Sequence, residues 1–225
     1  MAKARTTAFF CKECGYESSK WMGQCPACKA WNSMVEEPVS KPAGSQAGLG
    51  RLASGSQKSP VPAARPSLLS EIDIEEQDRI STGFGELDRV LGDGIVAGSL
   101  VLVGGDPGIG KSTLLLQVCR NLAGAGQRVL YISGEESLKQ IKMRANRIGP
   151  VTGELKFLCE TSLEHIERAI DAENPQIAVI DSIQTMYREE ISSAPGSVSQ
   201  VRESTGILMQ IAKSRGIAIF VVGHV

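Results

Sequence analysis

From about residue 68 onward, short apolar runs alternate with longer stretches of mixed polar and apolar residues. The apolar runs are rich in Val, Ile and Leu, which is typical of strands buried on both faces, and they cover residues 99–105, 128–134, 155–159, 176–182 and 217–223. The stretches between them predict helices, several of them closed by Gly or Asn, at about residues 112–123, 137–148, 162–173 and 198–215. Alternating strands and helices predict an α/β fold with a mainly parallel sheet.

Composition divides the chain into three zones. Residues 1–36 hold four of the six cysteines and both tryptophans, which indicates a compact unit too small to fold on an apolar core alone. Residues 37–67 are rich in Pro, Gly, Ser and Ala and contain no aromatic residue, so we expect a flexible linker. Residues 68–225 form the α/β domain. Because the sequence stops directly after a predicted strand, we expect this domain to be incomplete and the chain to be the front part of a longer protein.

Charge is unevenly distributed along the chain. The formal net charge is −1, but residues 1–67 carry nine basic and four acidic residues. The near-neutral total argues against a purely electrostatic nucleic-acid binder, whereas the basic leading segment can still meet phosphates locally. No apolar run approaches the roughly 18 residues of a membrane span, and the N-terminus lacks the apolar stretch of a secretory signal. We therefore expect a cytoplasmic protein with no membrane partner.

Four cysteines of the first zone have metal-ligand spacing. Cys11, Cys14, Cys25 and Cys28 form two CxxC pairs separated by ten residues. Each pair can direct two thiolates at one point, which predicts a tetrahedral Zn²⁺ site. Two disulfides or a redox pair fit an unexported chain poorly, and an iron–sulfur centre is the main alternative. Cys119 and Cys159 lie in apolar patterns, so we expect them in the core.

Five aromatic residues accompany these cysteines: Phe9, Phe10, Tyr16, Trp21 and Trp31. They are able either to stack on nucleic-acid bases or to pack around the metal. In so small a unit we expect packing for most of them.

A phosphate-binding pattern follows the strand predicted at residues 99–105. The segment GDPGIGKS matches GxxxxGK[ST] between a strand and a helix, the context in which backbone N–H groups and a helix N-terminus close around a phosphate. Lys111 is expected to reach the β and γ phosphates, Ser112 to ligate Mg²⁺, and Thr113 to support the α-phosphate side. The predicted nucleotide loop comprises Gly105, Asp106, Pro107, Gly108, Ile109, Gly110, Lys111, Ser112 and Thr113.

Polar residues end three other predicted strands. Asp181 ends the run QIAVID and is expected to hold Mg²⁺ through water beside Ser112. Glu135 and Glu136 follow another strand; we predict Glu135 as the base that polarises the attacking water, with Glu136 as its neighbour or substitute, although either is also an ordinary helix N-terminal charge. His224 ends the last strand and is either a γ-phosphate sensor or a buried structural histidine.

Taken together, these motifs resemble one family. STGFGELDRVLGDGIVAGSLVLVGGDPGIGKSTLLLQ, YISGEES, AVIDSIQTMY and GSVSQVRES are similar to the RecA-like P-loop ATPase core of the bacterial RadA/Sms DNA-repair proteins. The leading CxxC pairs and the linker match that family too. The resemblance implies that Gly105 to Ser112 bind ATP, that Glu135 is catalytic, that Asp181 is the strand-end acid, that His224 is the sensor, and that the four cysteines hold zinc.

The resemblance also implies a function and partners. Family members are hexameric, ATP-driven motors that bind single-stranded and branched DNA and promote branch migration alongside the RecA recombinase. Tyr187, Arg188 and Arg202 lie in a segment that faces the ring channel in RecA-like proteins, although neighbouring Glu189 and Glu190 weaken an assignment to DNA. Family segments that complete the motor would lie beyond Val225, so we expect weak or negligible hydrolysis by residues 1–225 alone.

Two other functions remain open from the sequence. One is a KaiC-like or DnaB-like hexameric ATPase with another client. The other is a zinc-ribbon adaptor whose nucleotide site only switches partner binding.

Overall fold

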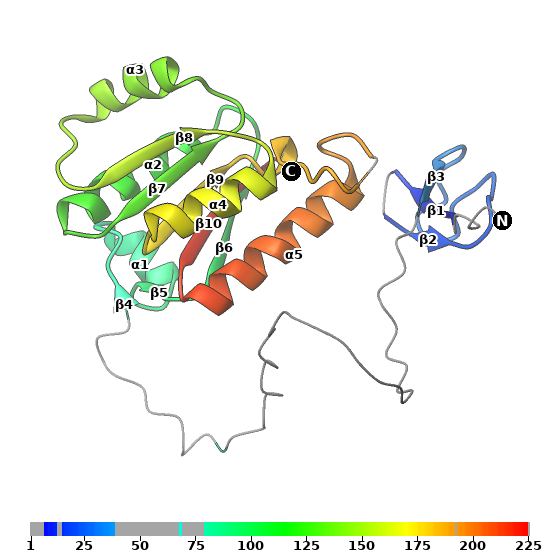
Figure 1. Ribbon diagram of the computed structural model, residues 1–225, viewed down its shortest axis with the longest axis horizontal. Coiled ribbons are helices and arrows are strands. Elements are labelled where there is room, and N and C mark those ends of the chain that lie inside the picture. Colours follow the sequence, from blue (N-terminus) through cyan, green and yellow to red (C-terminus); the bar gives the residue numbers. More distant parts are fainter. Residues whose placement is uncertain (1–6, 13–14, 39–67, 69–78, 192, 225) are drawn as a thin grey trace, which may run out of the picture.

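The computed structural model describes residues 7–12, 15–38, 68, 79–191 and 193–224. Figure 1 shows a small N-terminal module of strands and a larger domain of helices and strands. Residues 39–67, nearly all of the predicted linker, lie outside the described residues.

The N-terminal module is built on a three-stranded antiparallel sheet of order β2-β1-β3. Its strands are β1 (Thr7–Cys11), β2 (Glu17–Ser18) and β3 (Met34–Pro38). Among its described residues few apolar ones are buried, namely Ala8, Cys11, Cys25 and Met34, and Phe9 and Met22 pack against the last three. So small a core agrees with a module that depends on a metal for its stability.

The larger domain is built on a five-stranded sheet of order β6-β10-β9-β7-β8, in which all neighbouring strands are parallel. The strands are β6 (Leu100–Gly105), β7 (Val129–Ser133), β8 (Leu155–Cys159), β9 (Ile177–Asp181) and β10 (Ala218–His224). The predicted α/β class with a mainly parallel sheet, preceded by a small zinc-ribbon-like module, is confirmed.

The helices between these strands lie where the sequence predicts them. They are α2 (Lys111–Gly124), α3 (Leu138–Ile148), α4 (Leu163–Glu173) and α5 (Val198–Arg215). Local signals set their ends: Ser137 and Gln140 form a capping box at the start of α3, and Gly216 follows α5 with a φ of 66°.

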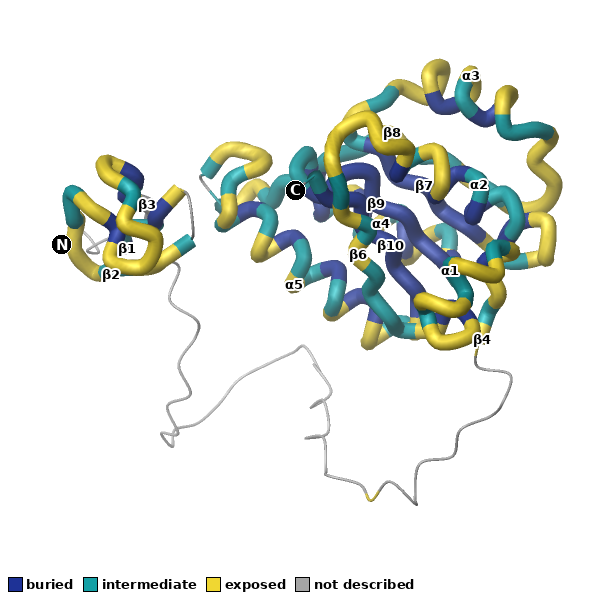
Figure 2. The backbone as a smooth tube through the Cα atoms, turned by 180° about the vertical axis from the view of Figure 1, so that it is seen from behind, coloured by how far each residue is buried: buried dark blue, intermediate teal, exposed yellow. Residues whose placement is uncertain are grey.

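Helices cover both faces of the sheet and so create two apolar cores. One core joins α2 and Ala145 of α3 to residues such as Tyr131, Val179 and Phe220. The other joins α4 and α5 to the opposite face of the same strands. Figure 2 shows the central strands β7, β9 and β10 as the most buried part of the domain. A sheet covered on both faces holds its strand ends in fixed positions, so residues that follow different strands keep a fixed geometry relative to one another.

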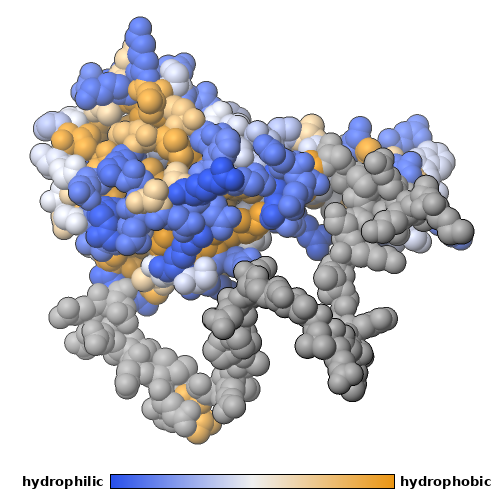
Figure 3. All heavy atoms as spheres, viewed as in Figure 1, coloured by the Kyte–Doolittle hydropathy of each residue, from blue (hydrophilic) through white to orange (hydrophobic). Residues whose placement is uncertain are grey.

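The two edge strands differ from the expectation of full burial. In β6, Leu102 is 67% exposed, and β8 also alternates between exposed and partly buried residues. The prediction of buried strands is therefore correct for β7, β9 and β10 and wrong for β6 and β8, because an edge strand has a neighbour on one side only. Figure 3 shows hydrophilic residues predominating on the outward faces of α4 and α5.

A short hairpin and helix precede the sheet. They comprise β4 (Arg79–Ile80), α1 (Gly85–Val90) and β5 (Ile95–Val96). The Asp88 carboxylate accepts hydrogen bonds from the Ser81 hydroxyl at 2.6 Å and from the Thr82 N–H at 2.8 Å. Asn121 of α2 donates to the Thr82 carbonyl at 3.3 Å, which ties this segment to the core. A short 3₁₀ helix, η2 (Ile183–Thr185), follows β9.

Candidate nucleotide and metal sites

The loop from Gly105 to Ser112 joins the end of β6 to the start of α2. Gly108 and Gly110 have φ angles of 81° and 104°, values that favour glycine. No atom lies within 4 Å of the position that a Cβ would take at either residue. The backbone thus borders open space beside the N-terminus of α2, and this arrangement fits a phosphate group. Asp106, Pro107, Ile109 and Thr113 are exposed around it, and Ser112 is partly buried.

Lys111 lies at the base of this loop and is only 7% exposed. Its ammonium group donates to the carbonyls of Gly105 at 2.7 Å and Asp106 at 2.9 Å. Both carbonyls are neutral, and no carboxylate among the described residues lies in hydrogen-bond contact with the Lys111 ammonium group. A triphosphate would supply the anionic partner that these carbonyls only partly replace.

His224 links Lys111 to Glu135. The Lys111 Nζ lies 3.2 Å from His224 Nδ1, and His224 Nε2 lies 3.1 Å from Glu135 Oε1. The Lys111 ammonium group is a donor only and an ionised carboxylate is an acceptor only, so the imidazole ring lies between a donor on its Nδ1 side and an acceptor on its Nε2 side. His224 thus contacts both the predicted phosphate-binding cation and the predicted base.

Glu135 receives a second hydrogen bond, from the Ser182 hydroxyl. Burial acts to raise the pKa of Glu135, but the hydrogen bonds from Ser182 and His224 and the positive charge of Lys111 outweigh it, so the pKa lies below its ordinary value. The carboxylate is therefore ionised at neutral pH. Three strand ends contribute to this cluster, because Glu135 follows β7, Ser182 follows β9 and His224 ends β10.

Glu136 forms an ion pair with Arg144. Its Oε1 lies 2.5 Å from the Arg144 guanidinium on α3. This ion pair gives Glu136 a partner on α3, whereas Glu135 contacts Ser182 and His224.

Asp181 ends β9 and is 3% exposed. Its carboxylate accepts a hydrogen bond from the Tyr131 hydroxyl of the neighbouring strand β7. Burial and the charge of Asp181 raise the pKa of Tyr131, so the phenol keeps its proton and donates it. The sequence analysis did not single out Tyr131 or Ser182; the only sequence signal for Tyr131 is a phenol inside an otherwise aliphatic strand.

Replacing Tyr131 by Phe tests this support. The ring of Tyr131 packs against Phe157 with centroids 5.7 Å apart, so Tyr131→Phe keeps the packing and removes only the hydroxyl. The buried carboxylate then loses a donor, and we expect the free energy of unfolding to fall by about 1–3 kcal/mol. Urea unfolding followed by circular dichroism measures this. Tyr16→Phe, an exposed site in the other module, is the control; equal stability of the two variants would contradict the support role.

The described cysteines of the N-terminal module converge. The sulfurs of Cys11, Cys25 and Cys28 all lie within 4.8 Å of one another, with 3.5 Å between Cys11 and Cys28. Four thiolates at about 2.3 Å from one Zn²⁺ are about 3.8 Å apart, so the spacing fits a tetrahedral metal site. Tight turns bring the sulfurs together: the Gly15 N–H donates to the Cys11 carbonyl and the Lys29 N–H to the Cys25 carbonyl, each at 2.8 Å. Cys14, the predicted fourth ligand, lies outside the described residues.

Metal removal should unfold this module. Thiolate ligands couple metal binding to folding, so we expect about one equivalent of zinc in the purified protein and loss of the module's fold on chelation. Elemental analysis and near-ultraviolet circular dichroism measure the two effects. Cys25→Ser should lose the metal, whereas Cys119→Ser, in the core of the other domain, should retain it. Iron in place of zinc, or full metal content in Cys25→Ser, would contradict the assignment.

Two expectations about buried residues need correction. Cys119 is buried as expected, but Cys159 is exposed because it ends the edge strand β8. Most of the module's aromatic residues do not pack around the metal: Trp21, Trp31 and Tyr16 are 59%, 72% and 39% exposed. Only Phe9 and Phe10 are partly buried.

The segment between η2 and α5 is held by Gln200, which is buried. Its side-chain amide donates to the carbonyls of Arg188, Ile191 and Ser193 at 3.0–3.2 Å, and its carbonyl accepts from the Arg188 N–H. This role was not foreseen from the sequence. The glutamine fixes the path of a segment that would otherwise rely on turns alone.

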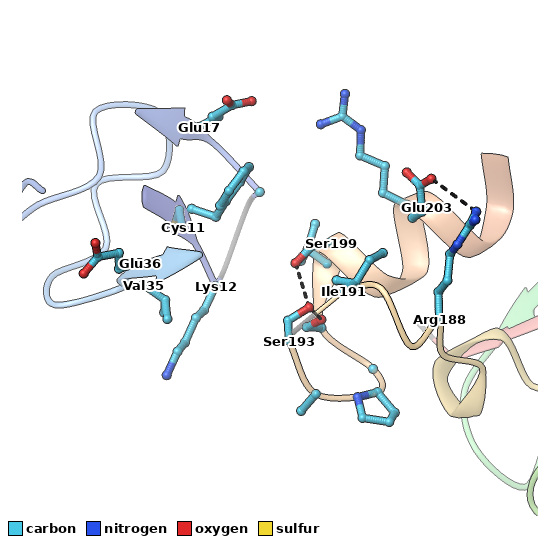
Figure 4. A pocket seen from close by; sticks show the side chains of 18 of the residues that line it. Cys11, Lys12, Glu17, Val35, Glu36, Arg188, Ile191, Ser193, Ser199 and Glu203 are labelled. Carbon is cyan, nitrogen blue, oxygen red and sulfur yellow. Dashed lines mark hydrogen bonds and ion pairs between the residues drawn. The ribbon is translucent and has the colours of Figure 1, made fainter. Parts of the chain in front are cut away.

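Acidic residues surround the side chain of Arg188. Its guanidinium lies 3.6 Å from Glu164, 3.1 Å from Glu190 and 4.0 Å from Glu203, and Figure 4 shows it directed toward Glu203. Arg188 is thus largely neutralised within the chain. Arg202 is exposed and Tyr187 is partly buried. The pocket drawn in Figure 4 is lined by charges of both signs, including Lys12, Arg202, Glu17 and Glu36, and so has no net preference for an anion.

Comparison with known proteins gives two family matches. Residues 9–36 match a model described as a rubredoxin metal binding domain, and residues 64–225 match one described as an AAA domain. The second match covers most of the chain. The chain belongs to the AAA-domain family. Among the described residues, no helix is both long enough and apolar enough to cross a membrane.

Curated relatives extend over the full chain. The chain is 56% identical over 225 residues to the DNA repair protein RadA of Halalkalibacterium halodurans. It is 55% identical over 226 residues to RadA of Bacillus subtilis and 49% identical over 225 residues to RadA of Escherichia coli. Each alignment covers 100% of this chain and 48% of the relative, so the chain spans about half the length of these relatives. The resemblance to the RadA/Sms family is confirmed.

Proposed function

We propose that the chain is the zinc-binding and ATP-hydrolysing part of a DNA-dependent ATPase of recombinational DNA repair. The observation that carries the proposal is the convergence of Lys111, His224 and Glu135 beside the loop that follows β6. An AAA domain and relatives that are DNA repair proteins support an ATPase of this class.

The residues divide the chemistry among them. The loop from Gly105 to Ser112 holds the triphosphate, and Lys111 moves from the loop carbonyls to its terminal phosphates. Ser112, and Asp181 through water, would hold Mg²⁺, which would supply positive charge to neutralise the phosphate oxygens. Glu135 accepts a proton from the attacking water. His224, hydrogen-bonded to Lys111 and Glu135, senses whether the γ-phosphate is present.

The zones along the chain have separate roles in this proposal. Residues 1–36 bind zinc, residues 37–67 link the two domains, and residues 68–225 form the ATPase domain.

The chain spans about half the length of its relatives. RecA-like sites are completed by a basic residue of a neighbouring subunit, and loss of that residue lowers the hydrolysis rate about 10³-fold or more. We therefore propose that residues 1–225 alone bind ATP and Mg²⁺ weakly, hydrolyse ATP negligibly and do not form a stable hexamer.

The whole protein acts, in this proposal, as a hexameric cytoplasmic ring that binds single-stranded and branched DNA and promotes branch migration alongside the RecA recombinase. Extension of RecA-made joint molecules in the presence of the whole protein and ATP tests it directly. Faster extension that requires Lys111 supports the motor function. An unchanged rate with normal ATP hydrolysis would instead favour a KaiC-like or DnaB-like ATPase with another client.

A further inference from the structure

The zinc module carries two exposed tryptophans, Trp21 and Trp31, with 59% and 72% of their surface accessible. Two large aromatic side chains that remain exposed on so small a unit leave apolar surface in water without adding to its core, and such surface commonly marks an interaction site. The two rings are not part of the module's small core, in which Phe9 and Met22 pack against the buried residues Cys25 and Met34.

The two indole rings lie on either side of Gly23. A Cβ at Gly23 would meet Trp21 Cη2 at 3.7 Å and Trp31 Cζ3 at 3.9 Å, so both rings border the same small position. Backbone bonds fix this arrangement: the Asn32 N–H donates to the Gly23 carbonyl at 2.8 Å, and Gln24 forms a bridge with Trp31. We call Trp21, Gly23 and Trp31 the tryptophan face.

Basic and polar residues lie close to the tryptophan face along the chain. Lys20 and Lys29 are both exposed, as are Gln24 and Asn32. The sequence contains no acidic residue between Glu17 and Glu36. The only formal charges on this stretch, apart from the thiolates at the metal, are therefore positive.

We propose that the tryptophan face, with Lys20 and Lys29, binds single-stranded nucleic acid by stacking bases on Trp21 and Trp31. Flat aromatic rings beside cationic side chains match a strand in which bases alternate with phosphates. A duplex keeps its bases stacked inside and offers no such surface. A docking site for a protein would present a broader apolar core, whereas here each tryptophan has polar neighbours.

This site deepens the proposed function, which already includes binding of single-stranded DNA, by placing such binding in the zinc module. It rests on the module's own geometry rather than on ATP hydrolysis. Its test is therefore separate from the test of the ATPase, since binding is read without nucleotide.

Tryptophan fluorescence reports selectively on the tryptophan face, because the chain contains two tryptophans and both lie in the zinc module. Titration of the zinc-loaded chain with a 20-nucleotide oligo(dT) should quench the emission to saturation. With two phosphate contacts, from Lys20 and Lys29, the slope of log K against log salt should be about −1.4. Emission that oligo(dT) leaves unchanged would overturn the proposal and point to a protein as the occupant of the face.

Matched variants separate stacking from general hydrophobicity. Measured with labelled oligo(dT), Trp21→Leu and Trp31→Leu should each weaken binding about tenfold, whereas Trp21→Tyr and Trp31→Tyr should retain most of the affinity because they keep a stacking ring. Val90→Ala, at an exposed apolar position of α1, is the control and should change nothing. Zinc content must equal that of the parent chain in every variant. Equal affinities for the Leu and Tyr variants would overturn base stacking.

Discussion

Lys111→Ala is expected to lower ATP hydrolysis by the whole protein about 10³-fold or more. Lys111 supplies the positive charge beside the phosphate loop, and among the described residues the hydrogen-bond partners of its ammonium group are the carbonyls of Gly105 and Asp106 and the ring of His224. Removing a preorganised charge of this kind costs several kcal/mol of transition-state stabilisation. Steady-state release of phosphate measures hydrolysis, and fluorescent ATP analogues measure the accompanying loss of nucleotide affinity.

Lys139→Ala is the matched control for this variant. Lys139 is an exposed lysine on α3, so its removal takes away one positive charge that does not belong to the loop. Circular dichroism establishes whether Lys111→Ala is folded, since Lys111 is buried. A folded Lys111→Ala protein that hydrolyses ATP at the parent rate would exclude this loop as the hydrolysis site.

Glu135→Gln is expected to retain ATP binding and to lower turnover about 10²–10⁴-fold, the usual contribution of a general base. A glutamine carbonyl still accepts hydrogen bonds from Ser182 and His224, so the surrounding contacts survive while the basic group is lost. The depressed pKa of Glu135 sets the pH dependence: the carboxylate stays ionised at neutral pH, and turnover should fall only as the pH drops through that lowered pKa. A pH profile of kcat measures this.

Glu136→Gln is the control for Glu135→Gln. It removes an adjacent carboxylate that pairs with Arg144, so we expect reduced stability of the start of α3 and near-normal turnover. The opposite outcome, with Glu136→Gln inactive and Glu135→Gln active, would move the base to Glu136.

Elements set by local patterns are the ones that the sequence predicts well. The helix expected at residues 198–215 is observed as Val198–Arg215, because Ser197 and Gly216 mark its ends by local hydrogen bonding and a left-handed turn. The sequence also predicts that Asp181 and His224 each end a strand, and the structure places these two strands, β9 and β10, next to each other. The roles of these residues in catalysis remain predictions.

Features that depend on contacts between residues far apart in the chain are not predicted from the sequence. The exposure of Cys159 follows from the edge position of β8, and strand order is not encoded in periodicity. The partner of Tyr131 is Asp181, on a different strand. The exposure of Trp21 and Trp31 depends on which side of the cysteine knuckle faces water, and composition alone does not specify that.

In the proposed function, hydrolysis at this nucleotide site drives work on DNA. The decisive measurement is the rate of ATP hydrolysis by the whole protein with and without single-stranded DNA. We expect DNA to raise the rate and Glu135→Gln to lower both rates about 10²–10⁴-fold. Parent protein that binds ATP and single-stranded DNA but hydrolyses ATP at the same rate in the presence and absence of DNA would contradict it and would favour a zinc-ribbon adaptor with a nucleotide switch.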